Sequence, residues 1–153
     1  YPDANSTLRL TYGQVSPLPK DPRNDAKENY YTTLKGTVKK FVKDDPEFDL
    51  PQGLIDLYES KDFGPYADKN GYMPVNFLTN NDITGGNSGS PVLNGKGELI
   101  GLAFDGNIEA MAGDVIFDNK LQKTINVDIR YVLFLIDKYA GAKHIVEEMT
   151  VIK

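Results

Sequence analysis

Residues 84–92 of this chain read TGGNSGSPV, with Ser88 among glycines and small polar residues. A serine hydroxyl is a weak nucleophile until a neighbouring base accepts its proton, and histidine most often supplies that base. The only histidine, His144, lies far downstream beside Lys143 and Glu147, in a pattern typical of a solvated helix face. The stretch therefore predicts a protease nucleophile, Ser88, without the base that activates it.

The glycines around Ser88 suit a second catalytic role. When a serine attacks a carbonyl, the carbonyl oxygen becomes negative, and fixed backbone N–H groups stabilise it without rearranging. Glycine accepts the backbone angles of a tight loop and leaves room for substrate. We expect the N–H groups of Gly86 and Ser88 to form this oxyanion hole. The alternative is an ordinary Gly/Ser/Asn turn between two strands.

Composition limits the classes of protein that fit. With 153 residues and 40% hydrophobic content, the chain is long enough for one domain with a real core. A net charge of -5 argues against a nucleic-acid partner. Cysteine is absent and the acidic residues lack the spacing of a calcium loop, so we expect no metal and no cofactor. No apolar run reaches the roughly 18 residues of a membrane span.

The pattern outside the motif predicts a mainly β chain with helices. Alternating and β-branched residues predict short strands at 6–15, 73–78, 90–93, 99–104, 115–117 and 124–127. The Asn94-Gly95 pair, followed by Gly97, indicates a hairpin between two of them. Several short antiparallel strands favour a barrel or a sandwich over a parallel sheet.

Two stretches have helical rather than β periodicity. Residues 30–69 carry apolar side chains at helical spacing and predict a small, mostly helical insertion. A second apolar stripe begins at Ile129, with Asp128 placed to cap the helix and Gly141 placed to end it. We therefore expect 1–153 to be a single segment, with 1–29 and 70–128 mainly β and with closing helices at 129–149.

Four separated segments resemble, in the same order, the C-terminal part of the S46 family of bacterial dipeptidyl peptidases. They are NSTLRLTYG at 5–13, DITGGNSGSPV at 82–92, FDGN at 104–107 and VDIRYV at 127–132. The resemblance implies the C-terminal, six-stranded-type antiparallel barrel of a chymotrypsin-like double-barrel protease. In that family the catalytic histidine and aspartate precede the serine. The resemblance thus implies a missing N-terminal part that supplies them, and an isolated segment that is inactive.

The resemblance also implies roles for individual residues. Ser88 is the expected nucleophile, with Gly86 and Ser88 as the oxyanion hole. Asp105 matches the aspartate that binds the free α-ammonium of an oligopeptide substrate. Gly106 matches a position where glycine goes with apolar P1 residues and arginine with Asp or Glu. We expect Phe104 to form part of the pocket wall.

Partners and location follow from the same resemblance. It implies a homodimer for the parent protein and a periplasmic, cell-surface or secreted location in a Gram-negative bacterium. For the isolated segment we expect associated or strand-swapped oligomers, because apolar surface would lose its natural neighbours.

Two alternatives stay open on the sequence. A glutamyl-endopeptidase-like or HtrA-like serine protease shares Gly-Asn-Ser-Gly followed by a small residue and proline. A non-catalytic β domain that binds a partner would carry Ser88 in an ordinary turn. A requirement for a free substrate amine would favour an S46 peptidase over the first alternative. A reactive Ser88 would favour it over the second.

Overall fold

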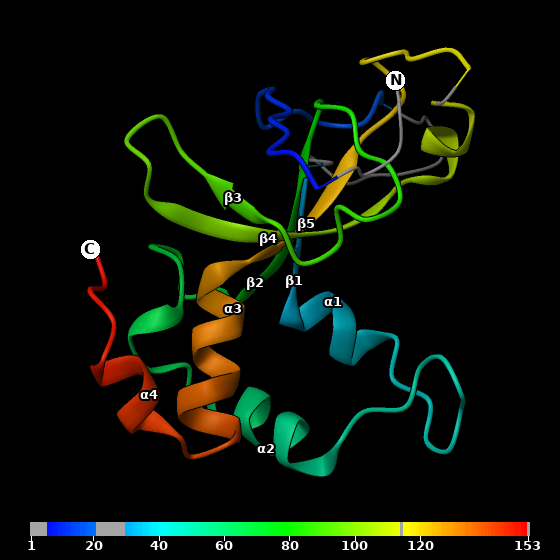
Figure 1. Ribbon diagram of the computed structural model, residues 1–153. Coiled ribbons are helices and arrows are strands. Elements are labelled where there is room, and N and C mark those ends of the chain that lie inside the picture. The colour runs from blue at the N-terminus through cyan, green and yellow to red at the C-terminus, as the bar shows by residue number, and fades with distance from the viewer. Residues whose placement is uncertain (1–5, 21–29, 114, 153) are drawn as a thin grey trace. The chain divides into compact units, whose positions relative to one another are not determined.

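The computed structural model describes residues 6–20, 30–113 and 115–152. Those parts of the predicted 1–29 region that fall at 1–5 and 21–29 lie outside the described residues. One five-stranded, mainly antiparallel sheet dominates the β structure (Figure 1). Its strands, in spatial order, are β1 (Tyr31–Thr33), β2 (Pro74–Thr79), β5 (Thr124–Asp128), β4 (Leu99–Gly106) and β3 (Pro91–Leu93).

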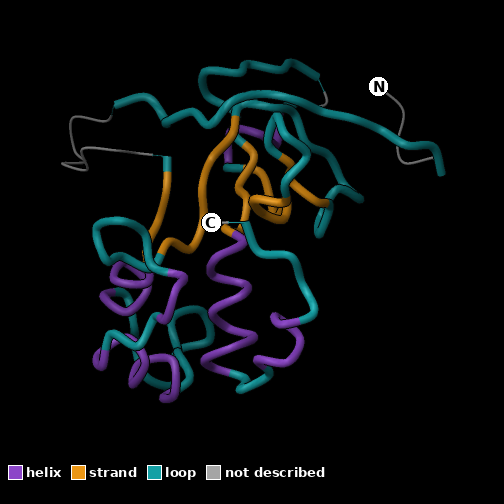
Figure 2. Tube along the Cα trace, turned by 90° about the vertical axis from the view of Figure 1, so that its left-hand side faces the viewer, coloured by secondary structure: helices purple, strands orange, loops and turns teal. Residues whose placement is uncertain are grey.

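The helices are short and fall in three stretches of the chain, purple in Figure 2. They are α1 (Leu34–Lys39), α2 (Gln52–Ser60), α3 (Ile129–Phe134) and α4 (Lys143–Glu147), with 3₁₀ turns η1 (Gly64–Tyr66) and η2 (Ile108–Ala112) and the π-helical turn η3 (Leu135–Tyr139). None of the helices in the described ranges combines the length and the apolar character that a membrane crossing requires.

The chain divides into two compact units. The sheet unit comprises the described residues of Tyr1–Tyr31 and Asn76–Val127, and the helical unit comprises those of Thr32–Val75 and Asp128–Lys153. The predicted insertion and the predicted closing helices thus belong to the same unit. The Ser88 motif, residues 84–92, belongs to the sheet unit.

The helical unit has a well-defined apolar core. Its buried residues are Leu34, Leu54, Phe63, Tyr66, Met73, Leu133 and Phe134. Phe63 and Phe134 meet edge to face with ring centroids 6.0 Å apart, a favoured aromatic geometry. The Leu34 N–H donates to Met73 O at 2.9 Å, which ties the start of α1 to the residue just before β2.

The start of α3 is held by a carboxylate, as its sequence predicts. Asp128 Oδ1 accepts the Arg130 backbone N–H at 2.9 Å, which satisfies one of the free N–H groups of the first helical turn. The Arg130 guanidinium donates to both carboxylate oxygens, at 2.9 and 2.7 Å. These charge-assisted bonds raise the pKa of Arg130. The predicted cap is confirmed, and Gly141 follows η3 with φ +64°, the left-handed conformation that ends helices.

Tyr66 supplies a pH-dependent contribution to the helical unit. Its hydroxyl donates to Asp137 Oδ2 at 2.8 Å, and burial together with this bond raises its pKa from 10.0 to about 12. Because the folded pKa lies above the unfolded one, the stabilisation is complete below about pH 10 and is lost as the pH rises through about 12.

We therefore expect the wild type to exceed Tyr66→Phe in free energy of unfolding by about 1 kcal/mol at pH 8, the net value of one hydrogen bond. The difference should shrink between pH 10 and 12. Urea titrations of both proteins across this range measure it, and because the two are compared at each pH, general alkaline denaturation cancels. A difference that stays constant to pH 12 would show that Tyr66 keeps an ordinary pKa.

The sheet confirms most of the predicted strands. β2 pairs with β5 in the register Asn76 to Val127 through Thr79 to Thr124. β3 and β4 form the predicted hairpin, whose turn is closed by Asn94 Oδ1 accepting the N–H groups of Lys96 and Glu98.

The predicted strand at 6–15 is wrong for most of its length. Only Val15 forms a bridge, to Thr79, and the backbone beyond it has no strand partner among the described residues. Its alternating apolar residues Leu8, Leu10 and Tyr12 are at least 87% exposed. A β pattern therefore becomes a strand only where a neighbouring backbone lies in register.

The predicted strand at 115–117 is also wrong. The N–H groups of Val115 and Ile116 both donate to Ala112 O, so a turn after η2 uses the donors that a ladder would need. The side-chain amide of Gln122 donates to Ile116 O at 2.9 Å and uses the acceptor as well. Local turn bonds replace β pairing here.

Candidate active site

Ser88 lies in the loop between β2 and β3, and Asn87 shapes that loop. We call residues 84–90 the nucleophile loop. The Thr84 N–H donates to Asn87 Oδ1 at 2.8 Å, and the Asn87 N–H donates back to Thr84 O at 3.2 Å. The Ser90 N–H donates to Asn87 O at 2.9 Å. Asn87 thus closes both sides of the turn, a role that the sequence reasoning missed although asparagine commonly bonds nearby backbone in turns.

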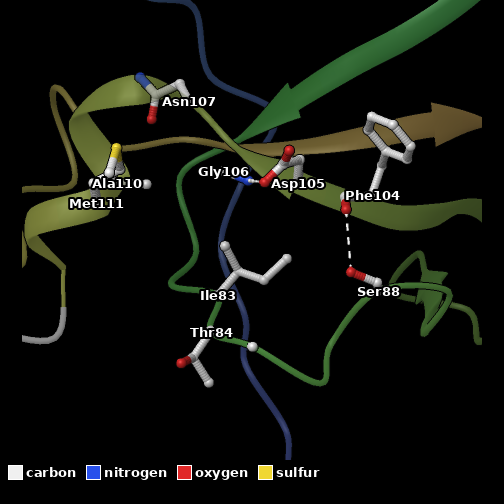
Figure 3. A pocket seen from close by; sticks show the side chains of 10 residues that line it. Ile83, Thr84, Ser88, Phe104, Asp105, Gly106, Asn107, Ala110 and Met111 are labelled. Atoms are coloured by element: carbon white, nitrogen blue, oxygen red, sulfur yellow. Dashed lines mark hydrogen bonds between the residues drawn. The ribbon is translucent and has the colours of Figure 1, made fainter.

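Strand β4 fixes the other side of the loop. The Gly89 N–H donates to Ala103 O at 2.7 Å, and the Ala103 N–H donates to Ser90 O at 2.9 Å. The Ser88 hydroxyl donates to Phe104 O at 3.3 Å, a long and weak bond (Figure 3). The exposed Ser88 side chain therefore lies beside the end of β4, immediately before Asp105 and Gly106.

The backbone of the nucleophile loop suits an oxyanion hole. Gly86 and Gly89 have φ of +94° and +82°, a region that favours glycine. Within the described part of the chain, the N–H groups of Gly86 and Ser88 donate to no protein acceptor. Stabilisation of a developing oxyanion needs donors of this kind, fixed by the loop and free to bind.

An open pocket of about 250 Å³ adjoins Ser88 in the sheet unit. Its lining residues are Ile83, Thr84, Gly85, Ser88, Phe104, Asp105, Gly106, Asn107, Ala110 and Met111 (Figure 3). Four of the five predicted site residues therefore line one pocket. The fifth, Gly86, lies in the same loop but outside the lining.

Asp105 and Phe104 are both accessible. Asp105 is exposed, and its Oδ1 accepts the Gly106 N–H at 2.8 Å, which leaves Oδ2 without a protein donor among the described residues. Phe104 is 58% exposed, so it lines the pocket rather than packing into the core of the sheet unit. The pocket thus offers one carboxylate and one aromatic face close to Ser88.

Space, rather than backbone conformation, requires glycine at position 106. A Cβ atom there would lie 2.7 Å from the Ala110 Cβ, which real Cβ atoms almost never approach so closely. The next nearest atoms are Ile83 Cγ2 at 3.8 Å and Lys123 O at 4.0 Å. The pocket floor beside Gly106 is therefore closed by the turn that carries Ala110.

Asn107 anchors the end of β4, a role that its place in the FDGN segment at 104–107 did not predict. Its Oδ1 accepts the Lys123 N–H at 2.8 Å, and its Nδ2 donates to Leu121 O at 2.7 Å and to Glu109 Oε2 at 2.6 Å. Its backbone N–H donates to Lys123 O at 3.0 Å. Lys123 is buried, and this burial lowers its pKa. Asn107 therefore fixes the Asp105–Gly106 pair against the start of β5.

His144 lies in α4, which belongs to the helical unit and not to the sheet unit that holds Ser88. Over residues 6–20, 30–113 and 115–152, no three His, Asp or Glu side chains are grouped so as to hold a metal ion. The pocket chemistry that the described residues offer is therefore a hydroxyl, a carboxylate and free backbone N–H groups.

A serine lies on a tight glycine loop, beside backbone N–H groups that bind no acceptor among the described residues and beside a pocket with a carboxylate. This arrangement defines a candidate serine-hydrolase site. The Peptidase S46 family model matches residues 1–151, and the chain belongs to this family. The predicted resemblance is confirmed.

Similar proteins carry two related names. The chain is 72% identical to a dipeptidyl-peptidase 7 of Capnocytophaga gingivalis, over 100% of this chain and 22% of that protein. It is 54% identical to an Asp/Glu-specific dipeptidyl-peptidase of the same organism, over 100% of this chain and 21% of that protein. The chain therefore spans about a fifth of the length of these relatives.

A solved structure shares the fold. The crystal structure of Porphyromonas endodontalis DPP11 in complex with the dipeptide Arg-Glu matches with a TM-score of 0.86 and 44% sequence identity. The match covers 93% of this chain and 20% of that chain. The described architecture thus corresponds to about a fifth of that longer chain.

Proposed function

We propose that this chain is the section of a serine dipeptidyl peptidase that carries the nucleophile, the oxyanion hole and the binding site for the substrate N-terminus. One observation carries the proposal: the Ser88 hydroxyl bonds to Phe104 O, so the nucleophile lies directly beside Asp105 and Gly106. The names of the S46 relatives support the release of dipeptides.

In the proposed reaction, Ser88 Oγ attacks the second peptide carbonyl of an oligopeptide. The hydroxyl proton passes to a histidine outside this chain, and the N–H groups of Gly86 and Ser88 stabilise the negative oxygen. The C–N bond then breaks, the histidine protonates the leaving amine, and the dipeptide stays as an ester on Ser88. Water, deprotonated by the same histidine, hydrolyses this ester and releases the dipeptide.

The histidine and its orienting aspartate are proposed to come from a preceding part of the full-length protein, as in a chymotrypsin-like double barrel. The sheet unit would then form the C-terminal barrel of that double barrel. The isolated chain is expected to be inactive, because serine alone is a weak nucleophile.

We propose that Asp105 fixes the length of the released product at two residues. A carboxylate with one free oxygen binds an α-ammonium through charge-assisted bonds, which are roughly twice as strong as neutral ones. Anchoring the substrate's first residue near Ser88 leaves room for two residues before the scissile bond. S46 membership favours this reading over a glutamyl-endopeptidase-like or HtrA-like enzyme and over a non-catalytic β domain.

The test of the proposed function uses the full-length protein and an unblocked heptapeptide, with the N-acetylated peptide as control. Mass spectrometry should show successive loss of dipeptides from the free peptide and none from the acetylated one. Internal cleavage of the acetylated peptide would contradict the proposal and favour an endopeptidase.

We predict an apolar P1 preference, because the residue after Asp105 is a glycine, which lines the pocket without adding a charge to it. Full-length protein should cleave dipeptidyl substrates with Leu, Met or Phe at P1 at least about tenfold faster, in kcat/KM, than those with Asp or Glu. Fluorogenic substrates with one fixed P2 residue measure this. Faster cleavage after Asp or Glu would overturn the assignment of Gly106.

We also propose that the full-length protein is a homodimer. Its proposed location is periplasmic, cell-surface or secreted. Both rest on the family resemblance. Light scattering of the full-length protein and fractionation of the source cells are the corresponding measurements. A strictly monomeric or cytoplasmic protein would contradict them.

A further inference from the structure

We propose that Ala110 is a second specificity-determining residue, which limits the size of the P1 side chain by closing the pocket beside Gly106. The inference rests on the proposed function, because it assigns the pocket beside Ser88 to P1. It adds a residue that no part of the serine motif contains.

Contact geometry is the first support. A Cβ built on Gly106 would lie 2.7 Å from the Ala110 Cβ, so the Ala110 methyl group already fills the space in front of Gly106. Both residues line the pocket, and Figure 3 shows them beside Asp105 and Met111. The volume left to an apolar side chain is therefore set by position 110 as much as by position 106.

The turn that carries Ala110 is anchored, which is the second support. The Ala110 N–H donates to Asn107 O at 2.9 Å, and Ala110 O accepts the Gly113 N–H at 2.9 Å. Asn107 is itself held to Lys123 by two bonds, at 2.8 and 3.0 Å. A larger side chain at 110 would therefore fill the pocket before the turn could move away.

The physical consequence is a size filter. One methylene more or less in a hydrophobic pocket changes selectivity by roughly 10–200-fold. A valine or leucine at 110 should exclude bulky P1 side chains and spare alanine. Chemistry at Ser88 should persist, because neither substitution touches the nucleophile loop bonds from Asn87 and Ala103.

The experiment compares full-length wild type with Ala110→Val and Ala110→Leu. The readouts are kcat/KM for dipeptidyl substrates with Phe or Ala at P1 and the same P2 residue, and the rate at which a fluorophosphonate labels Ser88. We expect the Phe-to-Ala ratio to fall at least about tenfold, with labelling within about twofold of wild type. Ala112→Val is the matched control, since Ala112 is exposed in the same turn and lies outside the pocket lining.

Three outcomes overturn the inference. They are an unchanged Phe-to-Ala ratio in both variants, an equal fall in the Ala112→Val control, and loss of Ser88 labelling in parallel with activity, which would make the turn a support for the nucleophile loop. Failure of the proposed function is visible separately, because wild type would then release no dipeptides from either substrate.

Discussion

Ser88→Ala in the full-length protein is expected to lower kcat/KM for dipeptide release by about 10⁴- to 10⁶-fold, the range seen when a serine-protease nucleophile is removed. The alanine cannot form the acyl ester, and only binding and oxyanion stabilisation remain. Little change in folding is expected, because the Ser88 side chain is exposed and makes one long bond, to Phe104 O. Steady-state assays with a fluorogenic dipeptidyl substrate measure the loss.

Ser90→Ala is the matched control for this substitution. Ser90 belongs to the same loop, and its backbone forms hydrogen bonds to Asn87 and Ala103. We expect it to retain activity within about tenfold, since no reacting atom is removed. Equal losses in the two variants, or a Ser88→Ala protein with substantial activity, would show that Ser88 is not the nucleophile.

Asp105→Asn should produce the second largest loss, about 10²-fold in kcat/KM for substrates with a free N-terminus. The substitution removes the negative charge and keeps an oxygen that can accept the Gly106 N–H, so the local backbone is preserved. A charge-assisted bond to an ammonium is worth about 1.5–3 kcal/mol, which corresponds to roughly 10–150-fold. We expect this loss in kcat/KM for cleavage. The rate at which a fluorophosphonate labels Ser88 should not change.

Asp118→Asn controls for the change in net charge. Asp118 lies in the same unit, accepts the Lys120 N–H in a turn and lies outside the pocket lining. Its substitution should alter kcat/KM by less than about threefold, as expected for a charge that does not touch substrate. The assignment of Asp105 fails if Asp105→Asn cleaves free peptides normally, or if it loses labelling of Ser88 together with activity.

The sequence predicted the fold correctly where the residues that signal a turn or a helix start also make the bonds that form it. Asn94-Gly95 predicts the β3–β4 hairpin because the asparagine side chain closes the turn itself. Asp128 predicts the start of α3 because a cap acts on the N–H groups next to it. The strand predicted at 6–15 fails because alternation describes side chains and says nothing about whether a partner backbone lies alongside.

Some residues of the candidate site could likewise be predicted from the sequence, and others could not. The motif around Ser88 and the resemblance at Asp105 and Gly106 concern residues that are close in sequence, and all three line one pocket. Asn107 and Ala110 were not predicted, because their roles depend on contacts made in three dimensions: Asn107 with Lys123, and Ala110 with the space at Gly106. No sequence spacing encodes such contacts.

The decisive experiment treats the full-length protein with a biotinylated fluorophosphonate and maps the adduct by peptide mass spectrometry while following dipeptide release. We predict one adduct, on the peptide that contains Ser88, and loss of activity in proportion to its occupancy, because the activated nucleophile is the group that such reagents modify. Full inactivation with the adduct elsewhere, or complete modification of Ser88 with dipeptide release intact, would contradict the assignment of this chain as the nucleophile-bearing section of a serine dipeptidyl peptidase.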